Sequence, residues 1–389
     1  MSFEIPDLVI ENTKEDETPP LSCVDLLREF KEIRAELLSG KEKAESGGLN
    51  NEFELSDEET SKSEDMDNKS ELFVGEKLKF AGVEDENGRE RDVYNISAPF
   101  SIDVDGELKT VITGRVELRE TCKGSQVYFF EQNKDGVWIP VEGVLPLPLE
   151  DGFFTQIGKE TVIGGVETSC PDPEEPKRVD YRTLFYHDNG RGLKGLEQFA
   201  SGPERGKDIR LTLLSNGRVA VFTRPQGGEY GLGKIAYVEL DSLEELNAAN
   251  LQRAKVIENQ FAQEEWGGAN ELHLLPDGRI GVIGHIAYKD EENNRHYYVM
   301  SFLYNPKDHS STPIKILATR EDFPPGAAKA TDLGDVVFSG GMVRHGNGKA
   351  TLYVGLSDVE AGSIKIDDPF WEVEQKILAG PTQRAEATA

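Results

Sequence analysis

The sequence predicts an all-β fold, a five-bladed β-propeller over residues 77–372. Three observations support this prediction. Hairpin signals recur along these residues, two of the hairpins repeat one another, and 39 glycines with 19 prolines supply many tight turns. Such a composition is typical of a turn-rich β protein rather than a helical one.

An acidic N-terminal segment, residues 1–76, precedes the predicted propeller. Residues 1–75 contain 21 acidic and 8 basic side chains. Residues 41–71 are also rich in serine and glycine and nearly free of large apolar groups. Because such a stretch cannot bury enough apolar surface to offset its chain entropy, we predict that it is disordered.

One helix is predicted inside this segment, near residues 23–39. Ser22 can cap its first turn and Gly40 follows its last one. Four apolar residues share one helical face, namely Leu26, Phe30, Ile33 and Leu37. We expect the helix to dock on the body of the protein, and transient binding of a partner is the alternative.

Repeated units of strand, tight turn and strand begin at Lys77. Asn216-Gly217 and Asp277-Gly278 each join alternating apolar runs, which is the strongest short-range hairpin signal. The run IRLTLLSNGRVAVFT aligns with ELHLLPDGRIGVIGH about 60 residues later, and a repeat of this length indicates radially arranged sheets. The predicted units lie near residues 92–132, 159–190, 206–240, 268–304 and 331–366.

Two further expectations concern the remaining residues. A second helix is predicted at residues 242–254, and residues 373–389 are expected to form a C-terminal tail. The alternative fold is a β-sandwich with long insertions, but a sandwich would not explain the long repeat.

The formal net charge of −29 restricts the ligands. An acidic surface repels phosphate backbones and anionic lipids, so we expect neither a nucleic acid nor a membrane as partner. A neutral polar ligand suits this field, whereas an anionic ligand would need a local basic pocket. The sequence shows neither an apolar run of membrane-spanning length nor a signal peptide, and its three cysteines form no disulfide framework. A cytoplasmic location is therefore expected.

The candidate catalytic residues come from the predicted propeller geometry. The innermost strand of each blade starts at a central funnel, so distant polar residues meet at one mouth. Each blade offers a carboxylate there: Glu117, Glu167, Asp208, Glu271 and Asp332. Converging carboxylates are what glycoside hydrolysis requires, because one group must hold a proton while another stays ionised.

Other side chains at the same entry points are candidates for substrate binding. Trp266 could offer an aromatic platform for a sugar ring. The remaining candidates are Asn95, Arg115, Glu117, Glu167, Arg210, Arg224, Asn270 and His285. Each has a structural alternative: Asp208 could pair with Arg210 to fix a blade, and His285 could be a satisfied core residue. We expect no cofactor and no metal site, since the six histidines form no closely spaced pair.

Motifs in order along residues 78–372 resemble one protein family. The matching stretches include Phe80–Val83, Asp92–Phe100, Gly114–Glu117, Lys207–Arg210 and Trp266–Glu271. The family is labelled MTP-like, was long filed as a domain of unknown function, and is similar to β-mannoside phosphorylases and β-mannosidases. The resemblance implies a glycosidase-like five-bladed propeller.

The resemblance also suggests roles for individual residues. In the phosphorylases a Glu-Asp-Pro-Arg motif supplies the catalytic acid, and Lys207-Asp208-Ile209-Arg210 resembles it except at its first and third residues. Asp208 would then be the general acid, with Glu271 or Asp332 as its partner carboxylate.

Three functions remain open at this stage. The first is an enzyme that cleaves or transfers a glycosidic, in particular mannosidic, bond. It could use phosphate if Arg115, Arg210, Arg224 and His285 form a cationic pocket. The second is a propeller that binds carbohydrate without catalysis. The third is a scaffold whose N-terminal segment recruits a protein partner.

Overall fold

The computed structural model describes residues 19–46, 75–119, 124–169 and 179–379. The disorder predicted for residues 41–71 lies outside the described residues from residue 47 onwards. No helix in the described ranges has the length and apolar character needed to cross a membrane.

The described chain is mostly β, which confirms the predicted all-β class. Its strands form five antiparallel units. Unit one contains β2 (Asp92–Tyr94), β3 (Phe100–Val104), β4 (Glu107–Glu117), β5 (Gln126–Gln132) and β6 (Trp138–Pro140). Unit two contains β7 (Glu150–Ile157), β8 (Glu160–Ser169), β9 (Asp180–Asp188) and β10 (Leu196–Ser201). Unit three contains β11 (Lys207–Leu213), β12 (Val219–Arg224), β13 (Ala236–Leu240) and β14 (Lys255–Val256).

The last two units share one eight-stranded sheet, because β17 and β19 pair in parallel. Unit four contains β15 (Trp266–Leu274), β16 (Ile280–Lys289), β17 (Arg295–Tyr304) and β18 (Lys315–Ala318). Unit five contains β19 (Asp335–Arg344), β20 (Lys349–Leu356) and β21 (Glu360–Asp367), and it is completed by β1 (Glu76–Lys77). An N-terminal strand therefore pairs with the last strand of the chain.

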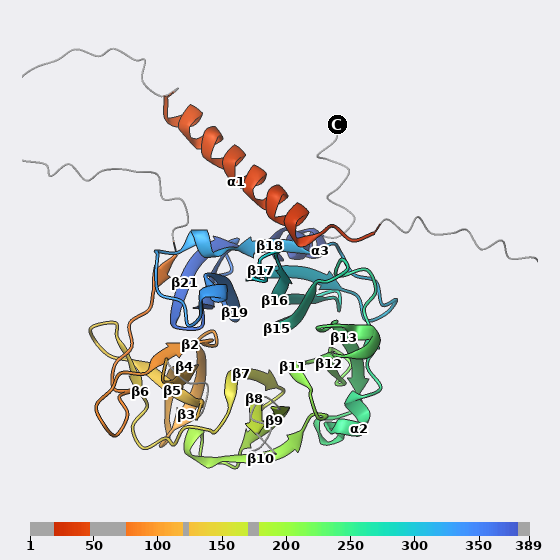
Figure 1. The fold of residues 1–389 in the computed structure, drawn as a ribbon. Helices are drawn as coiled ribbons and strands as arrows, with labels where there is room; N and C mark the ends of the chain where they lie inside the picture. The colour runs from red at the N-terminus through yellow and green to blue at the C-terminus, as the bar shows by residue number, and fades with distance from the viewer. Residues whose placement is uncertain (1–18, 47–74, 120–123, 170–178, 380–389) are drawn as a thin grey trace, which may run out of the picture.

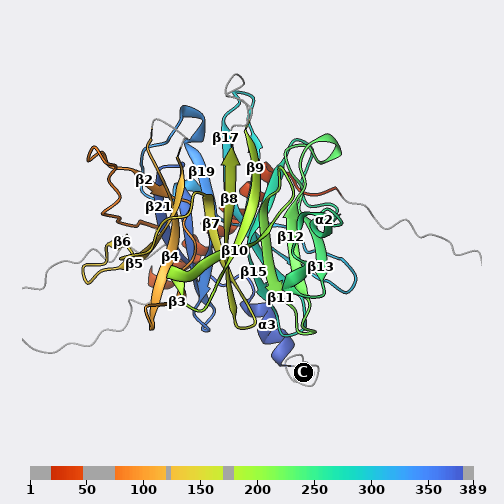
Figure 2. The same ribbon diagram turned by 90° about the horizontal axis from the view of Figure 1, so that it is seen from below.

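The five units lie around a common centre (Figure 1). Strands β2, β7, β11, β15 and β19 are innermost in this view, and Figure 2 shows the strands standing side by side. Apolar clusters fill the space between neighbouring units. Phe100 of unit one stacks on Phe154 of unit two at 4.0 Å, and Phe222 of unit three meets Tyr304 of unit four at 5.4 Å.

The inner strands share a local irregularity. Strands β7, β11, β15 and β19 each change register against their partner after the first few residues. Asp151 and Asp208 lie at two of these points and have φ angles of 50° and 54°, and Asn95, directly after β2, has a φ angle of 46°. Asparagine and aspartate tolerate the left-handed region better than most residues, and a bulge redirects a side chain. The bulges thus place an aspartate at a similar position in units two and three.

The helices differ from the prediction in extent. Helix α1 (Cys23–Ser46) begins as expected but continues past Gly40, and residues 242–254 form only η3 (Leu243–Glu245) and α2 (Ala248–Leu251). Helix α3 (Trp371–Leu378) was not predicted; an ion pair between Arg344 and Glu374 ties it to unit five. The remaining short helices are η1 (Leu193–Gly195), η2 (Gly228–Tyr230), η4 (Arg320–Asp322) and η5 (Thr331–Leu333).

The second unit starts earlier than predicted. It spans residues 150–201 instead of 159–190, and its innermost strand is β7. The predicted boundary missed β7 because no Asn-Gly or Asp-Gly turn follows it; the β7–β8 turn is Gly158-Lys159. This shift changes which residues reach the centre.

Candidate active site

Polar side chains from the five units meet near the beginnings of the inner strands. Their contacts form two groups. The Arg115 network consists of Tyr94, Asn95, Arg115, Glu117, Ser125, Glu150, Asp151 and Lys329. The Arg224 network consists of Asp208, Arg210, Arg224, Asn270 and His285.

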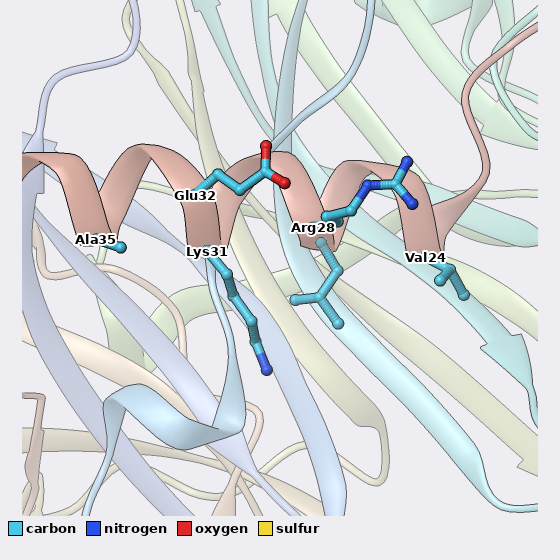
Figure 3. A pocket seen from close by; sticks show the side chains of 6 residues that line it. Val24, Arg28, Lys31, Glu32 and Ala35 are labelled. Carbon is cyan, nitrogen blue, oxygen red and sulfur yellow. The ribbon is translucent and has the colours of Figure 1, made fainter.

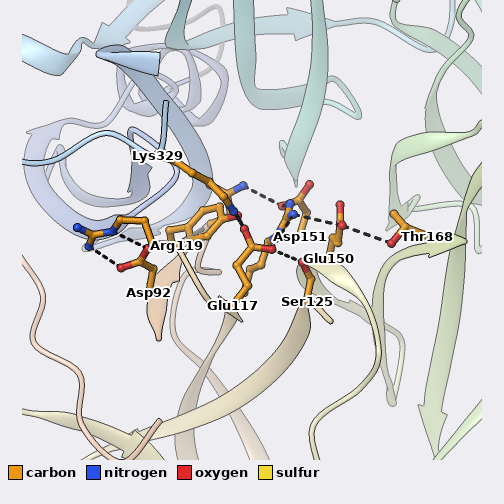
Figure 4. Close-up of polar contacts among 11 residues, drawn as sticks. Asp92, Glu117, Arg119, Ser125, Glu150, Asp151, Thr168 and Lys329 are labelled. Carbon is orange, nitrogen blue, oxygen red and sulfur yellow. Dashed lines mark hydrogen bonds and ion pairs between the residues drawn. The ribbon is translucent and has the colours of Figure 1, made fainter. Parts of the chain in front are cut away.

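Arg115 connects carboxylates from two units. Figure 4 shows these carboxylates, Glu117 of unit one and Glu150 and Asp151 of unit two. The Arg115 guanidinium lies 3.2 Å from Glu117, 3.2 Å from Glu150 and 3.3 Å from Asp151. Asn95 donates a further hydrogen bond of 2.8 Å to Asp151. A guanidinium offers five N–H donors in a planar fork, so one arginine can hold several carboxylates in place. Arg115 thereby sets the geometry between units one and two.

Glu117 is the fully buried carboxylate of the Arg115 network. It accepts hydrogen bonds from the hydroxyls of Tyr94 and Ser125 and forms an ion pair with Lys329. The Lys329 ammonium also lies 3.2 Å from the Tyr94 hydroxyl. Because both carboxylate oxygens of Glu117 already have partners, its role is to hold Arg115 and Lys329.

Burial is the largest cause of the pKa shifts in and beside the Arg115 network. Burial raises the pKa of the Glu150 carboxyl even though Arg115 opposes the shift, and the Asp151 charge adds to it. Burial likewise raises the pKa of Asp358, in the turn between β20 and β21. Burial and the charge of Arg115 lower the pKa of Lys329 to about 8. Two carboxyl groups in and beside the network therefore have pKa values above their usual range.

A buried ion pair forms the centre of the Arg224 network. Asp208 Oδ2 lies 2.7 Å from Arg224 Nη1, and the two side chains are only 4% and 5% exposed. His285 Nε2 lies 3.8 Å from the same oxygen, and its Nδ1 lies 2.9 Å from Asn270 Oδ1. A Cβ atom on Gly268 would come within 2.7 Å of Asp208 Oδ2, so glycine permits this close packing.

In the Arg224 network the pKa of the carboxylate is lowered, whereas carboxyl pKa values around Arg115 are raised. Burial would raise the pKa of Asp208, but the charges of Arg224 and Lys207 hold it well below its usual range. Burial lowers the pKa of His285 to about 3, against the attraction of Asp208. Asp208 is therefore ionised and His285 is neutral at pH 7. This corrects the predicted role of Asp208 as the protonated acid, and its arginine partner is Arg224 instead of Arg210.

The two networks adjoin. Burial lowers the pKa of Arg210 to about 10, and the charges of Asp208, Asp151 and Glu271 oppose that shift. The charge of Lys207 in unit three likewise opposes the upward shift in the pKa of Glu150 in unit two. Since Coulomb effects weaken with distance, the two networks form one polar cluster.

Several buried polar atoms of this cluster have no hydrogen-bond partner among the described residues. They are Asn95 Oδ1, Arg115 Nε, Arg224 Nε and Asn270 Nδ2. Buried polar atoms of folded proteins are normally paired, so each exception needs an explanation. Their concentration at one place suits a site that binds a polar ligand.

Most predicted site residues do come together. The cluster includes Asn95, Arg115, Glu117, Asp208, Arg210, Arg224, Asn270 and His285. Glu271 lies beside it, but its carboxylate is bound to the Met342 N–H at 2.8 Å and to His273 at 2.8 Å. Glu271 therefore connects units four and five.

Three predicted site residues lie elsewhere. Glu167 is 39% exposed and pairs with Arg182, and Asp332 is 35% exposed and pairs with Arg295. Trp266 is 4% exposed, and its indole N–H donates to the Tyr297 hydroxyl at 3.1 Å. A buried indole cannot serve as the predicted sugar platform. The half-buried rings of Tyr297 and Phe338, 5.7 and 5.0 Å from the His285 ring, are better placed for that role.

Sequence reasoning missed Glu150 and Asp151 as site residues. A signal for them was present, because Glu150-Asp151 matches the first two residues of the Glu-Asp-Pro-Arg motif. Lys207-Asp208-Ile209-Arg210 matches only its second and fourth residues. Asp151 and Asp208 occupy similar bulge positions in adjacent units, so Glu150-Asp151 is a second candidate for this motif beside Lys207–Arg210.

Comparisons with known proteins agree with this architecture. The family model described as "Protein of unknown function (DUF1861)" matches residues 64–372. The chain belongs to the DUF1861 family. No curated protein matches it.

Three solved structures resemble the DUF1861 chain at similar levels. MPT-4, a mannose phosphorylase from Leishmania mexicana in complex with phosphate, is 34% identical with a TM-score of 0.68, covering 77% of this chain and 89% of that one. MPT-1, a GDP-Man-dependent mannosyltransferase from Leishmania mexicana, is 32% identical with a TM-score of 0.66, covering 76% and 89%. A hypothetical protein from Leishmania major is 34% identical with a TM-score of 0.64, covering 76% and 90%.

Proposed function

We propose that this protein is a carbohydrate-active enzyme that transfers a mannosyl group between a sugar and a phosphate-bearing co-substrate. One observation carries the proposal. Five cationic side chains lie in or beside the polar cluster of a chain whose formal charge is −29. They are Arg115, Lys207, Arg210, Arg224 and Lys329. A neutral sugar alone would not require so many cations.

We further propose that the five units are the blades of one five-bladed β-propeller, formed by residues 77–372. The radial order of the units and the pairing of β1 with β21 support this reading. Its centre would then hold the active site. Two relatives of similar length support the choice of substrates, since one is a mannose phosphorylase in complex with phosphate and the other a GDP-Man-dependent mannosyltransferase.

The proposed chemistry divides the work between the two networks. Glu150, whose pKa is raised, supplies the proton, which passes to the glycosidic oxygen as its bond to the anomeric carbon breaks. A phosphate oxygen forms the new bond to that carbon, and the leaving sugar departs with the proton as a hydroxyl. Arg224, Arg210 and Lys207 attract the phosphate, while ionised Asp208 keeps Arg224 in position.

Incubation of the full-length protein with mannose 1-phosphate and mannose, and in reverse with mannobiose and inorganic phosphate, tests this proposal. We expect phosphate release in the first reaction and mannose 1-phosphate in the second. GDP-mannose as donor and mannobiose in water alone form the two comparison reactions.

Turnover of mannobiose without any phosphate compound would replace the proposal by hydrolysis. Calorimetric binding of mannobiose without turnover of any donor would replace it by the second hypothesis, a propeller that binds carbohydrate without catalysis.

A further inference from the structure

Helix α1 lies on the outer edge of units four and five (Figure 1). Cys23 and Leu26 are buried in the apolar cluster of units three and four, and Phe30 packs against it. The backbone N–H of Cys23 donates a 2.5 Å hydrogen bond to Glu265, the residue before β15. A carboxylate suits the first turn of a helix because free N–H groups and the helix dipole attract it. Unit four thus holds the start of α1.

A second attachment lies about three turns further along α1. Arg34 forms an ion pair with Asp322 of η4, whose side chain is only 3% exposed. One turn earlier, Lys31 lies 3.0 Å from Glu321 of the same short helix. Figure 3 shows Lys31 reaching away from α1, in a different direction from Arg28 and Glu32. One side of α1 therefore contacts η4 through two cations.

Asp322 is an organising residue for the segment that enters unit five. Its second oxygen accepts a 2.7 Å hydrogen bond from the Thr319 N–H, which closes the capping box of η4. Its backbone carbonyl accepts from the Gly75 N–H at 2.7 Å, next to β1. Arg34 supplies the opposite charge that this buried carboxylate needs.

Two further hydrogen bonds connect η4 to Lys329 of the polar cluster. Arg320 of η4 donates to the Ser357 hydroxyl at 3.2 Å. The Ser357 carbonyl accepts from the Lys329 N–H at 3.0 Å. Ser357 and Asp358 have φ angles of 51° and 57°, so surrounding contacts must hold this turn in an uncommon conformation.

We propose that Arg34 is a positioning residue for the Lys329 side of the candidate active site. It acts through Asp322 and Arg320, which fix the backbone of Lys329 and the turn that carries Asp358. This inference rests on the proposed function, because Lys329 is one of the five cations from which the phosphate-bearing substrate is argued. Docked α1 completes the site, and loss of the Arg34 contact lets the 319–329 segment move.

The control for this proposal lies on the same helix. Arg28 pairs with Asp25 of its own turn and has a side chain that is 62% exposed. It lines a shallow pocket of about 430 Å³ formed by α1 side chains alone (Figure 3). Arg28→Ala therefore removes a cation from α1 without touching η4.

Two measurements on the full-length Arg34→Ala, Arg34→Lys and Arg28→Ala proteins test the proposal. Hydrogen exchange should rise in residues 319–334 and 355–359 of Arg34→Ala and stay unchanged in units two and three. The KM for inorganic phosphate, with mannobiose as second substrate, should rise at least fivefold while kcat stays within twofold. Arg34→Lys should recover part of both effects, and Arg28→Ala should match the wild type.

Each other outcome has a defined meaning. Unchanged exchange in residues 319–334 overturns the proposal, and so does an equal rise across all five units, which would report a general loss of stability. A local rise in exchange with an unchanged KM overturns the role in the site. If the wild type shows no turnover, the proposed function fails; the local exchange result then still decides whether Arg34 positions this segment.

Discussion

The Arg115 and Arg224 networks are built from the same residue types but titrate in opposite directions. Both place a carboxylate at the bulge of an inner strand, Asp151 in one and Asp208 in the other, with arginine beside it. In the first network several carboxylates share Arg115, and the pKa of Glu150 is raised. In the second a single carboxylate faces several cations, and the pKa of Asp208 is lowered.

One polar cluster can therefore contain both a carboxyl group with a raised pKa and a carboxylate that stays ionised. The ratio of carboxylates to cations differs between the networks, and it outweighs burial, because Asp208 has the lowered pKa although it is more deeply buried than Glu150. Groups whose pKa values are pushed apart by their surroundings are the natural acid and base of a reaction.

Loss of the proposed acid should have the largest effect. Glu150→Gln keeps the side-chain shape and removes the acid, and Asp151→Asn removes a charge that raises the pKa of Glu150, so each should lower kcat, Glu150→Gln by roughly 100- to 10,000-fold. The assay is phosphorolysis of mannobiose. Glu167→Gln, an exposed carboxylate of the same unit, should stay within twofold, and equal loss in this control would refute the assignment.

Asp208→Asn should affect stability more than any exposed carboxylate does. It leaves the charge of buried Arg224 without its partner, which costs about 3 to 5 kcal/mol of unfolding free energy. Urea denaturation measures this difference. The matched variant is Asp332→Asn, whose half-exposed pair with Arg295 should contribute about 1 kcal/mol or less. A similar loss of unfolding free energy in both variants would show that the buried Asp208 pair stabilises the protein no more than the half-exposed Asp332 pair.

His285 should give the protein a specific pH dependence. Its pKa is about 3 in the folded chain and about 6.5 when unfolded. Between these values the unfolded chain binds one more proton, so stability falls as the pH falls from about 6.5 to 4, by up to about 1.4 kcal/mol per unit.

His285→Gln keeps a neutral polar side chain and removes this proton. Its unfolding free energy, measured across the same pH range, should show a slope smaller by that amount. Parallel slopes for the variant and the wild type would mean that His285 is charged in the folded chain.

Trp266→Phe should have the smallest effect. It removes one hydrogen bond to Tyr297, worth about 1 kcal/mol of stability. The KM for mannobiose should not change, whereas Phe338→Ala should raise it. A large increase in KM for Trp266→Phe would restore the indole as the sugar platform.

Much of the architecture could be predicted from local patterns. Asn216-Gly217 and Asp277-Gly278 mark turns through their own backbone preferences, and β11–β12 and β15–β16 follow these signals. The second unit was misplaced because its first turn lacks such a signal. That error moved attention from Glu150 and Asp151 on the innermost strand β7 to Glu167 near the far end of β8.

The amino-acid sequence alone was enough to predict the β class, the repeated hairpins, the family resemblance and most members of the polar cluster. These depend on periodicity, turn chemistry and motif order, which are local properties. The tertiary structure decided which carboxylate faces which cation. Asp208 meets Arg224 and Glu150 meets Arg115 only after the units pack, and a pKa depends on burial and on charges brought close from distant parts of the chain.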